Sequence, residues 1–305
     1  MAVAERILHV PHPVDLLLTL GPLRHGRGDP CTRFVGRDVW RATRTALGPV
    51  TVQLRADPAA GTVRARAWGP GAPAALDGLG DLVGATDDER GFETGHPLVA
   101  GLRRRFPGLR IPRTGAVLEA LVPTILAQRV TGGEAVRSYR SIVVRWGEPA
   151  PGPPARALGL RLPPAGEVLA GLPAWALHPY GVERARADTI RRAGRHRRRL
   201  EEAGAMAHDD ARRRLLALTG VGPWSAAEVS LVALGDADAV SVGDYHLPNQ
   251  VAWALAGRPR GDDALMLELL EPFRPHRGRV LRLLAVGGAA APKFGPKKPV
   301  DPWWR

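Results

Sequence analysis

The chain has 305 residues, 45% of them hydrophobic, so it is long enough for two domains with buried cores. The formal net charge of +13 favours nucleic acid as a partner, although arginine supplies nearly all of it and part of that excess fits a GC-rich coding bias. The single cysteine, Cys31, excludes an internal disulfide and a four-cysteine iron–sulfur cluster. Without a signal peptide or a long apolar run, we expect a soluble monomer in the cytoplasm that contacts no membrane.

The first part of the chain, up to about residue 107, predicts a small antiparallel sheet. Segments 49–57 and 62–69 alternate apolar and polar residues on either side of the turn sequence PAAG, which is typical of a hairpin. The stretch FVGRDVWRATR (34–44) supplies another candidate strand, and residues 72–84 have helical spacing. These patterns predict an N-terminal α+β sheet domain over residues 1–107.

From residue 114 onward almost every pattern predicts helix. A Pro-, Gly- and Arg-rich run at 147–166 is expected to be a loop or short linker, and 291–305 a basic, Pro-rich tail. An all-helical second domain is therefore predicted for 108–290. The helices are expected at 116–130, 134–146, 165–171, 181–203, 209–218, 224–234, 247–256, 263–271 and 276–286.

One short motif within this helical part, LTGVGPWSA (218–226), carries a candidate binding function. Gly220 and Gly222 allow a sharp turn and a close approach by another molecule. The apolar spacing of WSAAEVSLVAL then places the turn at a helix N-terminus, where exposed amides suit a phosphate oxygen. A glycine turn that only packs two helices together is the alternative interpretation.

Asp244, in the stretch SVGDYHLPNQVAWAL, is the second candidate. One interpretation is a capping aspartate before a helix. The other is a carboxylate held ionised at the positive end of that helix, where it stabilises a sugar cation or orients water.

The basic run RRAGRHRRR (191–199) has two interpretations as well. Ala187, Ile190 and Leu200 would form the buried side of its helix and leave the arginines facing solvent. The same arginines could raise non-specific affinity for DNA.

The helix–GVG–helix turn followed by a single aspartate resembles the helix-hairpin-helix (HhH-GPD) DNA glycosylase superfamily. Within it, the AlkA-type 3-methyladenine DNA glycosylase branch is the most similar. The segments PGLRIPRTGAVLEALVPTILAQRVTGGEA (107–135), HPYGVERARADTIRRAG (178–194) and RPHRGRVLRLL (274–284) resemble parts of that branch, as does HVPHPVDLLLTLG near the start. The resemblance covers about residues 8–290.

This resemblance implies a reaction and a partner. Such enzymes flip a damaged base out of double-stranded DNA into a pocket, since the glycosidic bond is inaccessible within the stack. The hairpin residues Gly220, Val221, Gly222 and Trp224 would hold a backbone phosphate through amides. Members of this family often hold a monovalent cation, sodium or potassium, on hairpin carbonyls. Here the matching carbonyls are those of Leu216, Leu218 and Val221, and no other cofactor is expected.

Trp224 separates two subclasses of these enzymes. Relatives that also cut the strand carry a lysine nucleophile at this position, and tryptophan cannot form a Schiff base. The resemblance therefore implies a monofunctional glycosylase with Asp244 as its catalytic carboxylate, acting on alkylated purines in base excision repair. A cationic alkylated base is already an activated leaving group and does not need a strong general acid.

The remaining site positions depart in part from the resemblance. Trp224 and Tyr245 keep aromatic side chains for the base pocket, whereas Glu228 and His246, with Pro22 and Ala285, stand where relatives have aromatics. Core packing is the alternative role for the two aromatics. The wedge that fills the gap left by the flipped base would comprise Gln128 and Arg129, although Arg129 could instead contact phosphate.

Two other functions stay open at this point. A non-catalytic DNA-binding protein could use the hairpin as a phosphate clamp, and a glycosylase could act on another damaged base, such as an oxidised one with strand cleavage. Asp244 and the aromatics favour the enzyme over the first, and Trp224 disfavours the strand-cleaving version of the second.

Overall fold

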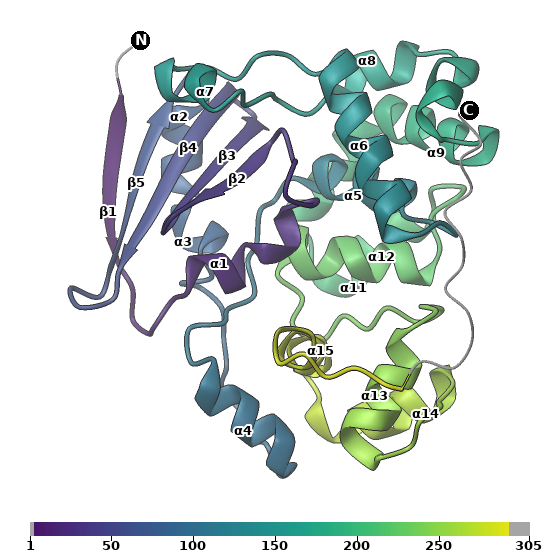
Figure 1. Cartoon of the computed structure of the whole chain (residues 1–305). Helices are drawn as coiled ribbons and strands as arrows, with labels where there is room; N and C mark the ends of the chain where they lie inside the picture. Colours follow the sequence, from purple (N-terminus) through teal and green to yellow (C-terminus); the bar gives the residue numbers. More distant parts are fainter. Residues whose placement is uncertain (1–2, 293–305) are drawn as a thin grey trace.

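The structure, a computed structural model, describes residues 3–292 and places an antiparallel sheet beside a larger body of helices (Figure 1). The strands lie in the order β1-β5-β4-β3-β2, and each neighbouring pair is antiparallel. The predicted α+β fold is confirmed, while the tail lies outside the described residues from 293 onward. The strands are β1 (Ala4–His9), β2 (Thr32–Val35), β3 (Asp38–Thr45), β4 (Gly48–Asp57) and β5 (Thr62–Trp68).

The sheet follows the alternation seen in the sequence. Val50, Val52 and Leu54 are buried at every second position of β4, in one core with helices α2 (Ala72–Asp77) and α3 (Leu79–Leu82). The stretch 34–44, predicted as one strand, instead contains parts of β2 and β3. Gly36 adopts a φ of +59° that lets the chain reverse there, and the two strands pair beside it.

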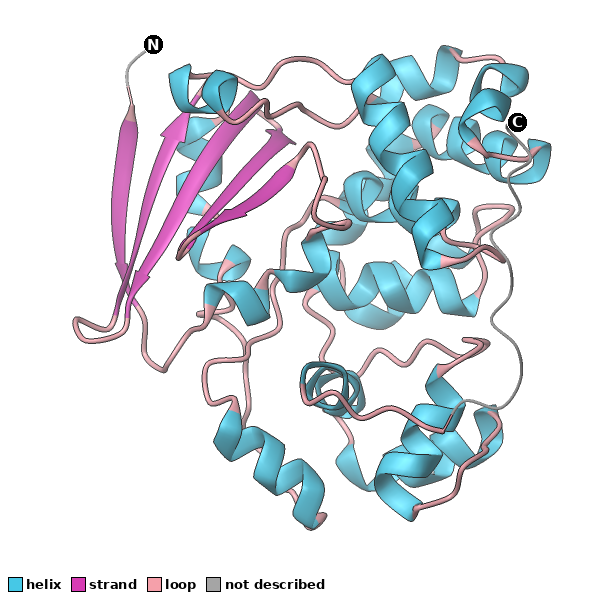
Figure 2. Ribbon diagram, viewed as in Figure 1, coloured by secondary structure: helices cyan, strands magenta, loops and turns pink. Residues whose placement is uncertain are grey.

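The helices predicted after residue 114 are present, with two changes (Figure 2). The helix expected over 181–203 is divided into α9 (Arg184–Arg195), α10 (Arg197–Glu201) and a 3-10 turn. The helix expected over 224–234 begins as α12 (Pro223–Val229) and continues as a π-helical turn over Ser230–Leu234. The others are α5 (Val117–Leu126), α6 (Gly132–Trp146), α8 (Gly166–Gly171), α11 (His208–Leu216), α13 (Leu247–Ala256), α14 (Asp263–Leu270) and α15 (Arg277–Val286).

Two segments join the parts of the molecule together. Helix α4 (Pro97–Arg105), which the patterns did not predict, buries Val99 and Leu102 in one core with residues of α13, α14 and α15. The run 147–166, predicted as a loop, contains the short helix α7 (Pro153–Ala157), and its apolar residues pack on Ala42 of the sheet. The sheet, the central helices around α5 and the C-terminal helices therefore meet in the middle of the molecule (Figure 1).

None of the helices between residues 3 and 292 is both long enough and apolar enough to cross a membrane.

Candidate functional site: a helical hairpin beside a polar cavity

The hairpin links α11 to α12, and its two glycines have different structural roles. Gly220 has a φ of +96°, and a Cβ added there would lie 2.1 Å from Thr189 Oγ1, so the fold itself requires glycine. Gly222 has a φ of −103°, and a Cβ added there would have no neighbour within 4 Å among residues 3–292. Nothing in this described part of the chain requires glycine at 222, so its open surface suits the close approach of a ligand.

The predicted wedge loop is attached directly to the hairpin. Gln128 Nε2 donates to the Gly220 carbonyl and to Ser225 Oγ, both at 2.9 Å. The next residue, Arg129, is exposed and is the one non-glycine residue of the described chain with a positive φ, +57°. A non-glycine residue in this region carries backbone strain, and such strain is concentrated at functional sites. Gln128 therefore holds the loop, while Arg129 extends from it.

Asp244 lies before α13 and uses both of its carboxylate oxygens. Oδ1 accepts from the backbone amides of His246 and Leu247 at 2.7 and 2.8 Å, as a capping aspartate does. Oδ2 accepts from the indole Nε1 of Trp224 at 3.0 Å. Because each carboxylate oxygen has two lone pairs, Oδ2 retains capacity for one further partner, such as water or a sugar atom.

The aromatic residues proposed for the base pocket lie outside the cavity described below. Trp224 is half-buried and oriented by its bond to Asp244. Tyr245 is 85% exposed, and its ring meets the exposed His246 ring edge-on at 4.8 Å. Neither a buried core role nor a cavity-lining role describes Tyr245 in this structure. Its place in a base pocket stays a prediction.

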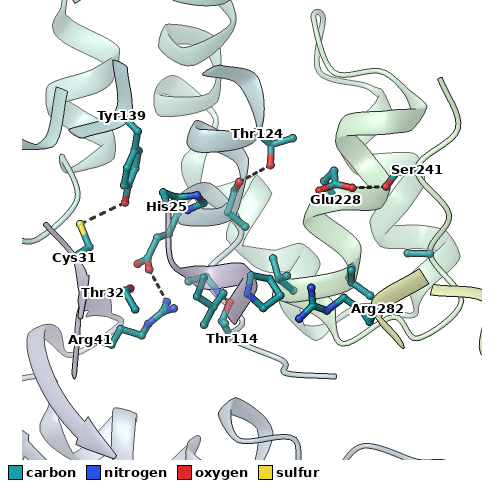
Figure 3. Close-up of a pocket in the computed structure, with 18 of the residues that line it drawn as sticks. His25, Cys31, Thr32, Arg41, Thr114, Thr124, Tyr139, Glu228, Ser241 and Arg282 are labelled. Atoms are coloured by element: carbon teal, nitrogen blue, oxygen red, sulfur yellow. Dashed lines mark hydrogen bonds and ion pairs between the residues drawn. The ribbon is translucent and has the colours of Figure 1, made fainter. Parts of the chain in front are cut away.

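A cavity of about 220 Å³ lies where the sheet, the central helices and the C-terminal helices meet (Figure 3). This is below the range of about 300–1,000 Å³ typical of pockets for drug-sized ligands, so a small ring system suits it. Glu228 lines it, as does Pro22. Ser241 and Leu247, each three positions from Asp244 in the chain, line it too, whereas Asp244 itself does not.

Charged and polar groups dominate two opposite sides of this cavity (Figure 3). On one side Glu228 accepts a short hydrogen bond from the Ser241 hydroxyl, and Arg282 approaches from α15. Burial raises the pKa of the Glu228 carboxyl and lowers that of Arg282 to about 10.

The opposite side carries an ion pair between β3 and α5. Arg41 donates to Glu119 at 2.5 Å, and both side chains are largely buried. Tyr139 donates to the buried Cys31 thiol at 3.4 Å, and the neighbouring His25 has a pKa that burial lowers to about 4. Sequence patterns did not identify these residues or Arg282, because they come from segments far apart in the chain.

The monovalent cation predicted on the hairpin carbonyls stays a prediction. The Leu218 carbonyl accepts from the Val221 amide at 2.9 Å, which leaves its second lone pair for a ligand. Leu216 is the last residue of α11, and Val221 lies in the turn. Carbonyl oxygens are suitable ligands for hard cations. Between residues 3 and 292, no cluster of His, Cys, Asp and Glu could hold a metal ion.

The basic run on α9 and α10 has the buried side that was predicted. Ala187, Ile190 and Leu200 are at most 2% exposed. One of the arginines, Arg192, donates to the Thr219 carbonyl at 3.2 Å and so reinforces the hairpin. Arg195, Arg198 and Arg199 are exposed to solvent.

Comparisons with known proteins identify the fold. No protein-family model matches the chain, and no curated protein matches its sequence. Among solved structures, a 3-methyladenine DNA glycosylase from Archaeoglobus fulgidus aligns with a TM-score of 0.75 and 18% identity, covering 92% of this chain and 97% of that one. An 8-oxoguanine glycosylase/lyase from Clostridium acetobutylicum aligns with a TM-score of 0.69 and 13% identity, covering 93% and 98%.

A complex of an 8-oxoguanine glycosylase/lyase from the same organism, holding double-stranded DNA with cytosine opposite 8-oxoguanine, gives a TM-score of 0.68 and 11% identity. It covers 94% of this chain and 98% of that one. At these identities the likeness defines the fold and leaves the substrate open. The chain therefore shares its fold with solved 3-methyladenine and 8-oxoguanine DNA glycosylases, in agreement with the resemblance carried by the sequence motif.

Proposed function

We propose that the protein is a monofunctional DNA glycosylase that binds damaged double-stranded DNA and hydrolyses the N-glycosidic bond of flipped-out alkylated purines of the 3-methyladenine type. The observation that carries this proposal is the placement of the Asp244 carboxylate. It is fixed by two backbone amides and by the indole of Trp224, the second residue of the helix that follows the hairpin, and its chain neighbours Ser241 and Leu247 line the cavity.

The hairpin provides binding in this proposal. Backbone amides of the turn from Gly220 to Trp224 would hold a phosphate, which gives affinity without sequence information. A monovalent cation on the carbonyls of Leu216, Leu218 and Val221 would add positive charge near that phosphate. Arg129 would fill the space that the flipped base leaves in the duplex.

The carboxylate provides the chemistry. As the bond between sugar and base breaks, positive charge develops on the sugar, and a fixed carboxylate nearby stabilises that charge. The base leaves with the bonding electrons, and water then adds its oxygen to the sugar carbon and releases a proton to solvent. Trp224 has no amine to attack the sugar, so the strand stays intact. A role limited to capping α13 would explain the amide bonds of Asp244 but not its bond to Trp224.

The test is release of free bases from methylated duplex DNA. We expect 3-methyladenine foremost among the products, identified by mass spectrometry, and an abasic site whose strand breaks only after alkali or heat. Borohydride should trap no covalent complex with DNA. Strand cleavage with a trapped complex would contradict the monofunctional assignment, and no base release from the methylated duplex would contradict the alkylated-purine substrate.

A further inference from the structure

The cavity contains an acid that the reaction proposed above does not use. Glu228, on α12, lines the cavity and directs its carboxyl toward Ser241, which lies between α12 and α13 and donates a hydrogen bond to it (Figure 3). Arg282 lines the same side from α15 and uses one of its nitrogens on the Leu18 carbonyl, at 3.0 Å. These contacts do not pair Glu228 with Arg282, and both side chains line a cavity in which a base would fit.

The surroundings of Glu228 favour its protonated form. Burial raises the pKa of the carboxyl most strongly, and the nearby charge of Asp244 raises it further. The Ser241 hydroxyl and the Arg282 guanidinium act in the opposite direction but do not cancel the effect of burial. The ion pair of Arg41 with Glu119 and the neutral His25 belong to the opposite side of the cavity.

A buried acid in the base pocket matters for one kind of substrate. A purine alkylated on a ring nitrogen carries a positive charge and leaves readily, whereas an uncharged purine departs as an anion unless it gains a proton. A carboxyl whose pKa is raised holds its proton over a wider range of pH and can act as a general acid in this way. Arg282 adds a donor of the type that pairs with the O6 and N7 acceptors of a 6-oxopurine.

We propose that Glu228 is a general acid that protonates the departing base when that base is an uncharged purine. This inference rests on the glycosylase function proposed above. The bond between the sugar C1′ and the base nitrogen breaks with both electrons staying on the base, and the Glu228 proton moves to a ring nitrogen of that base. Water adds its oxygen to C1′ and releases a proton to solvent, and the Glu228 carboxylate takes a proton from solvent before the next turnover.

The discriminating experiment compares two substrates with the parent and the Glu228→Gln variant. One duplex carries a single hypoxanthine, an uncharged 6-oxopurine, and the other carries methylated purines. Glutamine can still accept from Ser241 but cannot give up a proton. Single-turnover excision of hypoxanthine should fall by about 10²-fold or more, the usual contribution of a general acid. The ratio of the hypoxanthine rate to the methylated-purine rate should fall by at least tenfold.

The pH profile supplies a readout that a structural role would not move. Because the protonated carboxyl is the active form, the parent's hypoxanthine rate should fall as pH rises through the pKa of Glu228. Ser241→Ala removes a hydrogen bond that favours the carboxylate, so the same fall should occur at higher pH. The methylated-purine rate should show no such fall in either protein.

Three results would overturn the inference. They are a parent that releases no hypoxanthine, a Glu228→Gln variant that loses both activities in equal proportion, and a Ser241→Ala profile that coincides with the parent's. If the parent releases no methylated purine, the alkylated-purine proposal fails instead, and the role of Glu228 is still decided by the hypoxanthine duplex.

Discussion

Gly222→Asp tests the hairpin as the phosphate-binding element with little risk to the fold. A Cβ at this position has no neighbour within 4 Å in the part of the chain that the structure describes, and the backbone, with φ −103° and ψ −177°, is one that any residue adopts. Replacing such a glycine restricts the unfolded chain, so the stability of the free protein should be unchanged or slightly greater. Any loss of binding then reports on what approaches the turn from outside.

The size of that loss follows from Coulomb's law. A phosphate bonded to the turn amides would lie about 4 Å from the new carboxylate. At that separation repulsion costs about 1 kcal/mol in bulk water and about 4 kcal/mol at a partly desolvated surface. DNA affinity should therefore fall by about 5-fold to 10³-fold.

Fluorescence anisotropy with a duplex containing an abasic-site analogue measures this effect. Gly222→Asn is the matched control, because it has nearly the same volume without the charge. The difference between the two variants should shrink as salt rises, since salt screens the repulsion. Equal affinity of both variants and the parent, with unchanged melting temperatures, would refute the assignment of the hairpin as the phosphate site.

Two further substitutions test how the site is held together. Trp224→Phe removes the indole N–H that donates a hydrogen bond to the charged Asp244 Oδ2. Because such a bond contributes about 1.5–3 kcal/mol, the single-turnover rate should fall by about 10-fold to 100-fold. An unchanged rate would show that this bond has no catalytic role. Gly220→Ala places a methyl group 2.1 Å from Thr189 Oγ1 at a φ of +96°. Thermal denaturation should therefore show that the free energy of unfolding falls by about 1–3 kcal/mol or more. A melting temperature equal to the parent's would contradict the turn geometry described above.

Local patterns predicted most of the elements, because periodicity and turn residues act over short distances. The alternation in β4 and the helical spacing of α13 are examples, and α13 spans the predicted residues 247–256. The glycines of the hairpin were also recognisable locally. Sequence could not distinguish their roles. The close approach of Thr189 shows that Gly220 is structural, and the space around Gly222 among the described residues shows that this position is open.

The arrangement of the candidate site depended on long-range contacts. Asp244 was identified by its spacing from the hairpin, but its bond to Trp224 joins residues 20 positions apart and required the folded structure. Glu228 was placed in a pocket only by resemblance, and its partner Ser241 and the facing Arg282 come from other elements. Helix α4 was missed because it is short and buries only Val99 and Leu102, so its apolar periodicity is weak.

The most direct test of the account is single-turnover base excision by the Asp244→Asn variant. Asparagine keeps the size of the side chain and can still accept from the amides of His246 and Leu247, but it then presents its own N–H₂ to the Trp224 indole. Because the capping bonds to the two amides can be kept, the free energy of unfolding should fall by no more than about 1–2 kcal/mol. If the charge stabilises the sugar cation, the excision rate should fall by about two to four decades, by analogy with other fixed electrostatic groups, while binding to damaged DNA persists. A folded, DNA-bound variant that is nearly inactive is the predicted result, and excision within a few-fold of the parent rate would contradict the catalytic role of Asp244.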